Sequence, residues 1–208
     1  MTLADKVTTT RLIFAPLFFV IYLLPRFFPA FFAVQGGSSV LAECSADLSW
    51  TVPVLWVIFV VSEITDMLDG MIARKRREVS DFGKLYDPFA DTLTQITYFF
   101  CFVIDGILPP ILFLAVLYRE FSILFIRNLM LKKGIALGAR LGGKIKTVTY
   151  ILAAALALLA SSMARLALGG RLYQWLTLAS KGVFVLSVII AVVSFIDYLI
   201  IFKKTDKI

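Results

Sequence analysis

The run WLTLASKGVFVLSVIIAVVSFIDYLIIF, residues 175–202, decides the fold class of this chain. Its 28 residues include only two charged side chains, Lys181 and Asp197. A helix needs about 20 predominantly apolar residues to cross the hydrocarbon core of a bilayer. Comparable apolar runs occupy residues 12–32, 52–71, 85–104, 107–130 and 147–167. The sequence therefore predicts an all-α integral membrane protein with six transmembrane helices.

The composition supports the same fold class. Of the 208 residues, 60% are hydrophobic, against roughly 45–50% in soluble domains. Six spans of about 20 residues would use about 120 residues, close to the hydrophobic content of this chain. A soluble single domain of this length could not bury so much apolar surface. Because the predicted connections are short, we expect one compact domain over residues 1–208.

Lysine and arginine residues are unevenly distributed between the predicted connections. Sixteen lie on the side that carries both termini, four lie on the other side, and Arg119 lies inside a predicted span. Cytoplasmic loops of membrane proteins carry such an excess of positive charge. The sequence therefore predicts a multi-pass protein of the cell (plasma or inner) membrane with both termini in the cytoplasm.

The residue types that are missing restrict the chemistry. The chain has no histidine, which excludes Ser-His-Asp triads, Cys-His dyads and His-ligated zinc. The formal charge of +7 is compatible with nucleic acid, but anionic lipid or a phosphorylated substrate explains it equally well in a membrane protein. We expect no nucleic-acid partner, and chemistry that depends on carboxylates, lysine, arginine and hydroxyl groups.

Four carboxylates lie where two predicted spans approach the cytoplasm. Asp66 and Asp69 share a helix face at spacing i, i+3, and Asp87 and Asp91 share one at spacing i, i+4. We expect a loop of about a dozen residues to join the two spans, which can then pack antiparallel and gather all four acids in one site facing the cytoplasm. The alternative is interfacial charges paired with the basic residues of this loop.

Clustered carboxylates without histidine or thiolate favour hard cations. Oxygen-only ligands select Mg²⁺ or Mn²⁺, and two such ions would neutralise the four acids. Gly70 and Ala73 leave space for a ligand close to the backbone, and Arg74 beside this space is suited to bind phosphate. The sequence thus predicts a metal-dependent site for a phosphorylated substrate.

These residues form a pattern that resembles a known family. The pattern is Asp66-Met-Leu-Asp69-Gly70-Met-Ile-Ala73-Arg74, then eight residues, then Gly83-Lys-Leu-Tyr-Asp87-Pro-Phe-Ala-Asp91. It matches the signature of the CDP-alcohol phosphatidyltransferases at all eight fixed positions. A chance match has odds on the order of 10⁻¹⁰ per starting position at average composition.

The resemblance implies a reaction and roles for individual residues. Family members transfer a phosphatidyl group from CDP-diacylglycerol to an alcohol, or a phosphoalcohol from a CDP-alcohol to diacylglycerol, and they are homodimers within membrane lipid. Asp66, Asp69, Asp87 and Asp91 would hold two Mg²⁺ or Mn²⁺ ions, with Asp91 also the catalytic base. The residues expected to bind the donor nucleotide are Thr8, Gly70, Ala73, Arg74, Ser80 and Gly83.

Two further stretches of sequence narrow the choice of acceptor alcohol. Residues 5–16 are similar to the N-terminus of the bacterial phosphatidylglycerophosphate synthases within this family, although Asp5 replaces their usual Asn. Residues 119–147 look like the fourth and fifth helices of the same branch. The resemblance therefore implies transfer of the phosphatidyl group to sn-glycerol 3-phosphate, giving phosphatidylglycerophosphate and CMP.

The basic residues of this second stretch fit a phosphorylated acceptor. Arg119 inside an apolar span needs a partner, and neighbouring Glu120 points about 100° away on a helix, so we expect a bound anion instead. We assign Arg119, Arg127, Lys144 and Lys146 to the acceptor phosphate. The alternative is a solvated positive loop.

Other functions remain possible from the sequence alone. Within the family, synthesis of phosphatidylinositol phosphate, phosphatidylserine or phosphatidylcholine would use the same signature. A cation transporter could also carry aspartate pairs, but near the bilayer midplane rather than beside one cytoplasmic loop. A membrane scaffold without enzymatic activity would need none of the acids.

Overall fold

The computed structural model describes residues 3–27, 49–76, 81–132, 134 and 141–205. Within these ranges, side chains are not described at 3–7, 25–27, 67–76, 81, 82, 84, 141, 201, 204 and 205. The described residues form helices and turns without a strand, which confirms the all-α prediction. The helices are α1 (Leu3–Phe27), α4 (Thr51–Arg76), α5 (Asp81–Ile104), α6 (Pro110–Lys132), α7 (Leu141–Arg165) and α8 (Arg171–Thr205).

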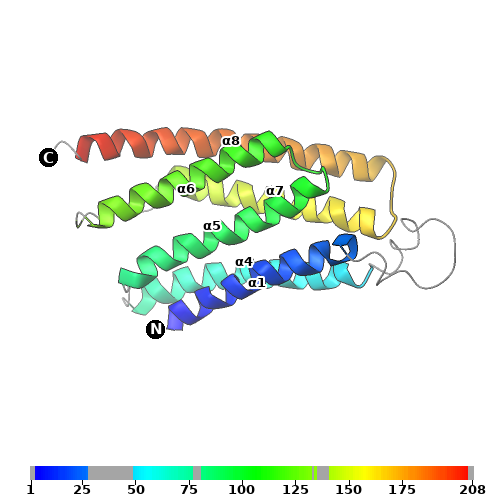
Figure 1. Ribbon diagram of the computed structural model, residues 1–208, viewed down its shortest axis with the longest axis horizontal. Helices are drawn as coiled ribbons and strands as arrows, with labels where there is room; N and C mark the ends of the chain where they lie inside the picture. The colour runs from blue at the N-terminus through cyan, green and yellow to red at the C-terminus, as the bar shows by residue number, and fades with distance from the viewer. Residues whose placement is uncertain (1–2, 28–48, 77–80, 133, 135–140, 206–208) are drawn as a thin grey trace.

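The helices form one elongated bundle in which successive helices run in opposite directions (Figure 1). Consequently α1 begins and α8 ends at the same end of the bundle, which we call the near end. Helices α4 and α6 also end at the near end, and α5 and α7 begin there. The turns from α5 to α6 and from α7 to α8 lie at the opposite, far end.

The helices extend beyond the apolar runs that predicted them. Helix α4 continues to Arg76 and α5 begins at Asp81, so four residues separate them rather than the expected dozen. Helix α8 begins at Arg171, before the apolar run at residue 175. Polar residues at the ends of a span continue its backbone hydrogen bonds, and hydropathy does not register this. Residues 28–32 of the first predicted span lie outside the described residues.

Helices α1 and α5 are parallel neighbours. Phe18 of α1 contacts Tyr98 of α5, with ring centroids 4.6 Å apart, and one turn later Tyr22 contacts Phe102 at 5.7 Å. The constant offset of 80 residues means that the two helices advance together. Helix α1 also packs against α4. Phe59 of α4 contacts Tyr98 of α5, with ring centroids 5.3 Å apart, but α1 is the helix that packs extensively against both α4 and α5.

The core at the centre of the bundle is aromatic. Phe99 of α5 contacts Tyr150 of α7 and Phe184 of α8, with ring centroids 5.2 and 4.8 Å apart. The sequence favours a lipid-facing position for Phe18 as an aromatic residue of the first predicted span, but Phe18 is fully buried, so this prediction is wrong. Edge-to-face and tilted aromatic contacts add specificity to the burial of apolar area. Helix α5 therefore lies in the middle of the bundle, where it contacts α1, α6, α7 and α8.

Helix α7 packs against α8 and buries a face of small residues. The face of α7 that is buried carries Ala153, Ala157 and Ala160. Such residues permit close approach of helix backbones in membrane proteins. At Gly142 a Cβ atom would lie 3.3 Å from Ser194 Oγ of α8. The glycine thus lets the first turn of α7 approach α8 at the near end.

The outer surface of the bundle is strongly apolar. Large side chains that are more than half exposed occur on α1, α4, α6, α7 and α8, for example Ile13, Val57, Ile111, Val148 and Val193. A contiguous surface of this kind is unusual for a soluble monomer. Two described stretches, Gly142–Arg165 and Arg171–Ile200, are long and apolar enough to cross a membrane. This finding supports a membrane protein, with two candidate spans.

A polar cluster closes the far end. Tyr22 donates its hydroxyl hydrogen to Asp105 Oδ2 at 2.5 Å and lies 2.7 Å from Ser161 Oγ. Arg165 donates to the Tyr22 carbonyl at 2.8 Å and to Thr51 Oγ1 at 3.2 Å. The Arg165 guanidinium also lies over the Tyr22 ring, 4.3 Å from its centroid. We call these five residues the far-end cluster.

Candidate active site

Arg11 joins the acids of two helices at the near end. Its Nη1 donates to Asp66 Oδ1 of α4 and to Asp91 Oδ1 of α5. On the same helix, Thr8 donates its hydroxyl hydrogen to Asp87 Oδ1 at 2.6 Å. Thr8 and Arg11 lie one turn apart on α1, as Asp87 and Asp91 do on α5, so the parallel packing brings the two pairs together. We call this group the acidic site.

The carboxylates of the acidic site remain accessible although their partner is buried. Side-chain exposure is 3% for Arg11, 37% for Asp66 and 38% for Asp91. Beside them a small cavity of about 10 Å³ is lined by Arg11, Ser62, Glu63, Asp66 and Asp91, together with Thr94 and Gln95. That volume is close to the space one water molecule needs.

This arrangement fits a hard divalent cation. Two carboxylates from different helices already converge on one positive nitrogen, and both keep surface for a further ligand. Their oxygen donors are the type that Mg²⁺ and Mn²⁺ prefer. Among the side chains that the structure describes, no three acidic, Cys or His side chains converge on one metal position. Asp69, a further predicted ligand, lies outside that set.

The remaining residues assigned to the donor are only partly described. Gly83 is buried in the first turn of α5. Asp69, Gly70, Ala73 and Arg74 belong to α4, but their side-chain positions lie outside the described residues, as does the whole of Ser80. Thr8 donates its hydroxyl hydrogen to Asp87. Its contact with the donor nucleotide stays a prediction.

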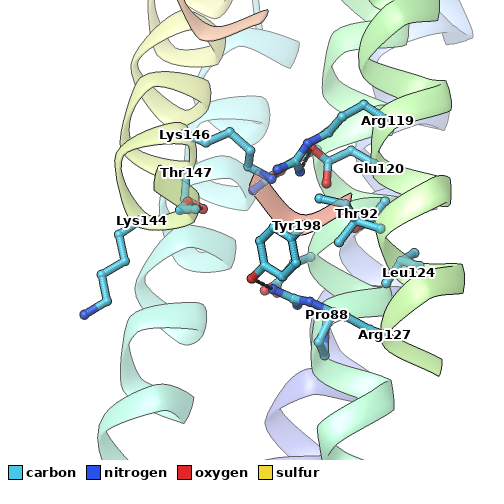
Figure 2. Close-up of a pocket in the computed structure, with 14 residues that line it drawn as sticks. Pro88, Thr92, Arg119, Glu120, Leu124, Arg127, Lys144, Lys146, Thr147 and Tyr198 are labelled. Carbon is cyan, nitrogen blue, oxygen red and sulfur yellow. Dashed lines mark hydrogen bonds and ion pairs between the residues drawn. The ribbon is translucent and has the colours of Figure 1, made fainter. Parts of the chain in front are cut away.

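A larger cavity of about 230 Å³ adjoins the acidic site between α5, α6, α7 and α8. Asp91 and Gln95 of α5 line both cavities, so α5 forms the boundary between them. Figure 2 shows the larger cavity, which we call the basic cavity. Its charged lining residues are Asp91, Arg119, Glu120, Arg127, Lys144 and Lys146. Four cations and two anions give this lining a formal charge of +2.

The structure therefore brings all four predicted acceptor residues to one cavity, although they differ in their surroundings. Arg127 donates from Nη2 to the Tyr198 hydroxyl oxygen at 3.1 Å, and its guanidinium carbon lies 5.6 Å from the centroid of that ring. Lys144 is exposed, and its side chain extends away from Arg119 and Lys146 (Figure 2). Arg127 is thus held in place, whereas Lys144 lies at the edge of the cavity.

The expectation that Glu120 cannot pair with Arg119 is wrong. Arg119 Nη1 donates to Glu120 Oε1 at 2.8 Å, and Lys146 Nζ donates to the same oxygen at 2.9 Å. The 100° separation applies to the directions in which the side chains leave the helix. Both side chains have several rotatable bonds, so their charged ends can meet beside α6. Arg119 therefore has an internal partner.

Sequence reasoning missed several residues of these two cavities. Arg11 was counted as a positive charge of the cytoplasmic side and as part of the similarity of residues 5–16, but it was given no role at the site. Its place one turn after Thr8 was a usable signal. Glu63 stands one turn before Asp66 and lines the same small cavity, but was given no role. Tyr198 had no signal, because its contact with Arg127 joins positions 71 residues apart.

The chain belongs to the CDP-alcohol phosphatidyltransferase family, whose sequence profile matches residues 1–193. This confirms the resemblance inferred from the aspartate pattern, and the chain is accordingly a transferase. Similar proteins include the CDP-diacylglycerol–glycerol-3-phosphate 3-phosphatidyltransferase of Treponema pallidum, which is 34% identical over 96% of this chain and 88% of its own length.

Two other relatives show the same relationship. The CDP-diacylglycerol–glycerol-3-phosphate 3-phosphatidyltransferase of Bacillus subtilis is 30% identical over 76% of each chain. A probable phosphatidylglycerophosphate synthase of Mycobacterium tuberculosis is 29% identical over 94% of this chain and 79% of its own length. The first of these names indicates a relative that acts on CDP-diacylglycerol and glycerol 3-phosphate, and the second a relative that makes phosphatidylglycerophosphate.

Proposed function

We propose that this protein transfers the phosphatidyl group of CDP-diacylglycerol to sn-glycerol 3-phosphate, giving phosphatidylglycerophosphate and CMP. The observation that carries this proposal is the basic cavity that adjoins the acidic site through Asp91. An acceptor with its own phosphate requires cations beside the reacting group, whereas choline or serine does not. The names of the relatives support the same acceptor.

The acidic site would bind the nucleotide diphosphate of the donor. Asp66, Asp69, Asp87 and Asp91 would hold two Mg²⁺ or Mn²⁺ ions, which neutralise negative charge on the pyrophosphate and on the leaving CMP. Arg11 keeps the carboxylates of Asp66 and Asp91 together, and Thr8 orients Asp87. Residues expected to contact the donor are Thr8, Gly70, Ala73, Arg74, Ser80 and Gly83.

The basic cavity would bind the acceptor. Arg119, Arg127 and Lys146 contribute buried or half-buried positive charge, and Lys144 contributes charge at the edge. With its phosphate held there, a glycerol hydroxyl group can lie next to Asp91. Holding two reactants in a fixed relative orientation removes much of the entropic part of the barrier.

Asp91 would accept the proton of that hydroxyl group. The hydroxyl oxygen then forms a bond to the phosphorus atom of the phosphatidyl group, and the bond from this phosphorus to CMP breaks. CMP leaves with the electron pair, so the charges and atoms balance. Arg11 holds one oxygen of Asp91 and thereby orients the carboxylate.

The same proposal includes a topology. All six helices would cross the cell membrane, residues 1–208 would form one domain, both termini and the active site would face the cytoplasm, and two copies would form a homodimer. The near end, where α1 begins, α8 ends and both cavities lie, is also the end to which the sequence pattern assigns the sixteen lysine and arginine residues. Outward-facing apolar side chains on successive helices support contact with lipid.

An acceptor panel with purified protein tests the reaction. With CDP-diacylglycerol and Mg²⁺, radiolabelled glycerol 3-phosphate should give labelled lipid, whereas glycerol, inositol, inositol phosphate, serine and choline should not. Addition of EDTA should stop turnover, and Mg²⁺ or Mn²⁺ should restore it. Efficient use of any other acceptor in the panel would move the assignment to another member activity of the family. Full turnover in EDTA would remove the metal ions from the proposal.

Cysteine labelling tests the topology. In a Cys44→Ser background, a Ser38→Cys variant should react with an impermeant thiol reagent from outside intact cells, and a Lys204→Cys variant should not. Cys101 is buried in the core, so it provides little background. The reverse pattern would mean that the near end faces outward.

A further inference from the structure

Glu120 lies between two of the cations of the basic cavity. Its carboxylate oxygen Oε1 accepts hydrogen bonds from Arg119 on the same helix and from Lys146 on α7 (Figure 2). Side-chain exposure is 5% for Glu120, 6% for Arg119 and 10% for Lys146. A single buried oxygen atom therefore holds two positive groups from two helices.

The two cations have further contacts that limit their movement. Arg119 Nε donates to the Ala191 carbonyl of α8 at 3.1 Å, and Lys146 Nζ lies 4.6 Å from the centroid of the Tyr150 ring. A guanidinium has five N–H hydrogens and an ammonium has three. The named contacts leave hydrogens on both groups, and both residues line the cavity. The pair can therefore donate to an anion without giving up these contacts.

Without Glu120, two like charges would stand close together in a buried site. A buried ion that loses its partner is strongly destabilised, and its side chain moves towards water or its charge is lost. Glu120 therefore keeps Arg119 and Lys146 in place before any substrate arrives. The group of three retains a formal charge of +1, so an anion is still attracted.

We propose that Glu120 is a positioning residue, which holds Arg119 and Lys146 where they can bind the acceptor phosphate. This inference rests on the acceptor site of the proposed function. It fixes the hydrogen-bond donors of Arg119 and Lys146 at the cavity. Two effects of its removal oppose each other, because the cavity becomes more positive while the cations lose their fixed position. The loss of position dominates, since a charge-assisted hydrogen bond requires a defined short distance and angle, whereas a displaced cation is screened by water.

Substitution of Glu120 separates these effects. In Glu120→Gln the size is kept and the charge is removed, and the acceptor KM should rise roughly 10-fold or more while the donor KM changes by less than about 2-fold. In Glu120→Asp the charge is kept on a shorter side chain, and the acceptor KM should lie between those of the wild type and Glu120→Gln. A merely structural role would lower the melting temperature without this selective change in KM.

The matched control is Asp105→Ala in the far-end cluster. It also removes an acid that is hydrogen-bonded to a buried side chain, but at the opposite end of the bundle. It should lower the melting temperature and leave both KM values unchanged. An acceptor KM in Glu120→Gln equal to or below that of the wild type would overturn the positioning role. If Glu120→Gln does not fold, a wild-type acceptor KM in Glu120→Asp would overturn it equally.

A binding measurement keeps this inference distinct from the proposed reaction. Inorganic phosphate is the probe, and isothermal titration calorimetry with purified wild-type protein and Glu120→Gln is the readout. Phosphate should bind the wild type and bind Glu120→Gln at least about 10-fold more weakly. Equal affinities would refute the role of Glu120, whatever the acceptor. Inactive wild-type protein in the acceptor panel would instead refute the reaction alone.

Discussion

The near end and the far end of the bundle both bury charged groups, but they use them differently. In the far-end cluster, Tyr22, Ser161 and Arg165 form hydrogen bonds with one another and with their neighbours. At the near end, Arg11 pairs with Asp66 and Asp91, whose carboxylates stay more than one-third exposed, and the basic cavity opens beside them. The first arrangement ties helix ends together, whereas the second leaves capacity for ligands.

This difference separates two reasons for placing charge in an apolar bundle. A charge that serves stability is best satisfied inside the protein, because an incomplete hydrogen-bond network is costly. A charge that serves binding must keep free surface and nearby space. Substitutions at the near end should therefore change activity more than stability, and substitutions at the far end should do the reverse.

The largest effect is expected for Asp66→Asn. The variant loses one charge of the acidic site, and kcat should fall by at least about 100-fold, as for removal of other electrostatic groups in active sites. Arg11 keeps its contact with Asp91, so the protein should stay folded. Mg²⁺ should raise the melting temperature of the wild type and raise that of the variant less. An unfolded Asp66→Asn protein would mean that the ion pair of Arg11 and Asp66 is structural, like the far-end cluster.

Lys146→Ala should act on the acceptor. A charge-assisted phosphate contact contributes about 1.5–3 kcal/mol, so the acceptor KM should rise roughly 10- to 150-fold. The donor KM should change little, because we expect the donor to bind at the acidic site. Initial rates with each substrate varied in turn measure both constants. Equal increases for donor and acceptor would mean that the basic cavity does not distinguish the two substrates.

Tyr198→Phe should have an intermediate effect. It removes the hydroxyl group that accepts from Arg127 and keeps the ring beneath the guanidinium. An intramolecular hydrogen bond contributes about 1 kcal/mol net, so the acceptor KM should rise about 5-fold. The same kinetic assay measures it. If the KM stays at the wild-type value, Arg127 does not contact the acceptor phosphate.

The smallest effect on activity is expected for Asp105→Ala. The variant loses the acceptor of the Tyr22 hydroxyl group, and its melting temperature should fall by about 5 °C. Both KM values and kcat should stay within about 2-fold of the wild type. Thermal unfolding and the kinetic assay together check this pair of results. Loss of turnover at unchanged stability would show that the far end also serves the reaction.

The sequence predicted the number and type of the described helices correctly, because long apolar runs determine them locally. It predicted their ends less well, since polar residues such as those before Arg76 continue a helix beyond its apolar part. It also predicted that Asp66 and Asp91 would come together. That prediction followed from spacing on two helices separated by a short connection.

The remaining features of the site depend on contacts between distant positions. The role of Arg11 follows from the parallel packing of α1 on α5, which no local pattern encodes. Glu120 was excluded as a partner of Arg119 because directions on a helix were considered without the reach of long side chains. Side-chain contacts between helices therefore required the structure.

We propose that donor and acceptor meet at Asp91, and the Asp91→Asn variant tests this role most directly. With purified protein, CDP-diacylglycerol, glycerol 3-phosphate and Mg²⁺, release of CMP by this variant should fall at least about 100-fold. Inorganic phosphate should still bind the variant with an affinity close to that of the wild type, because Arg119, Arg127 and Lys146 are unchanged. CMP release within 10-fold of the wild-type rate would contradict the claim.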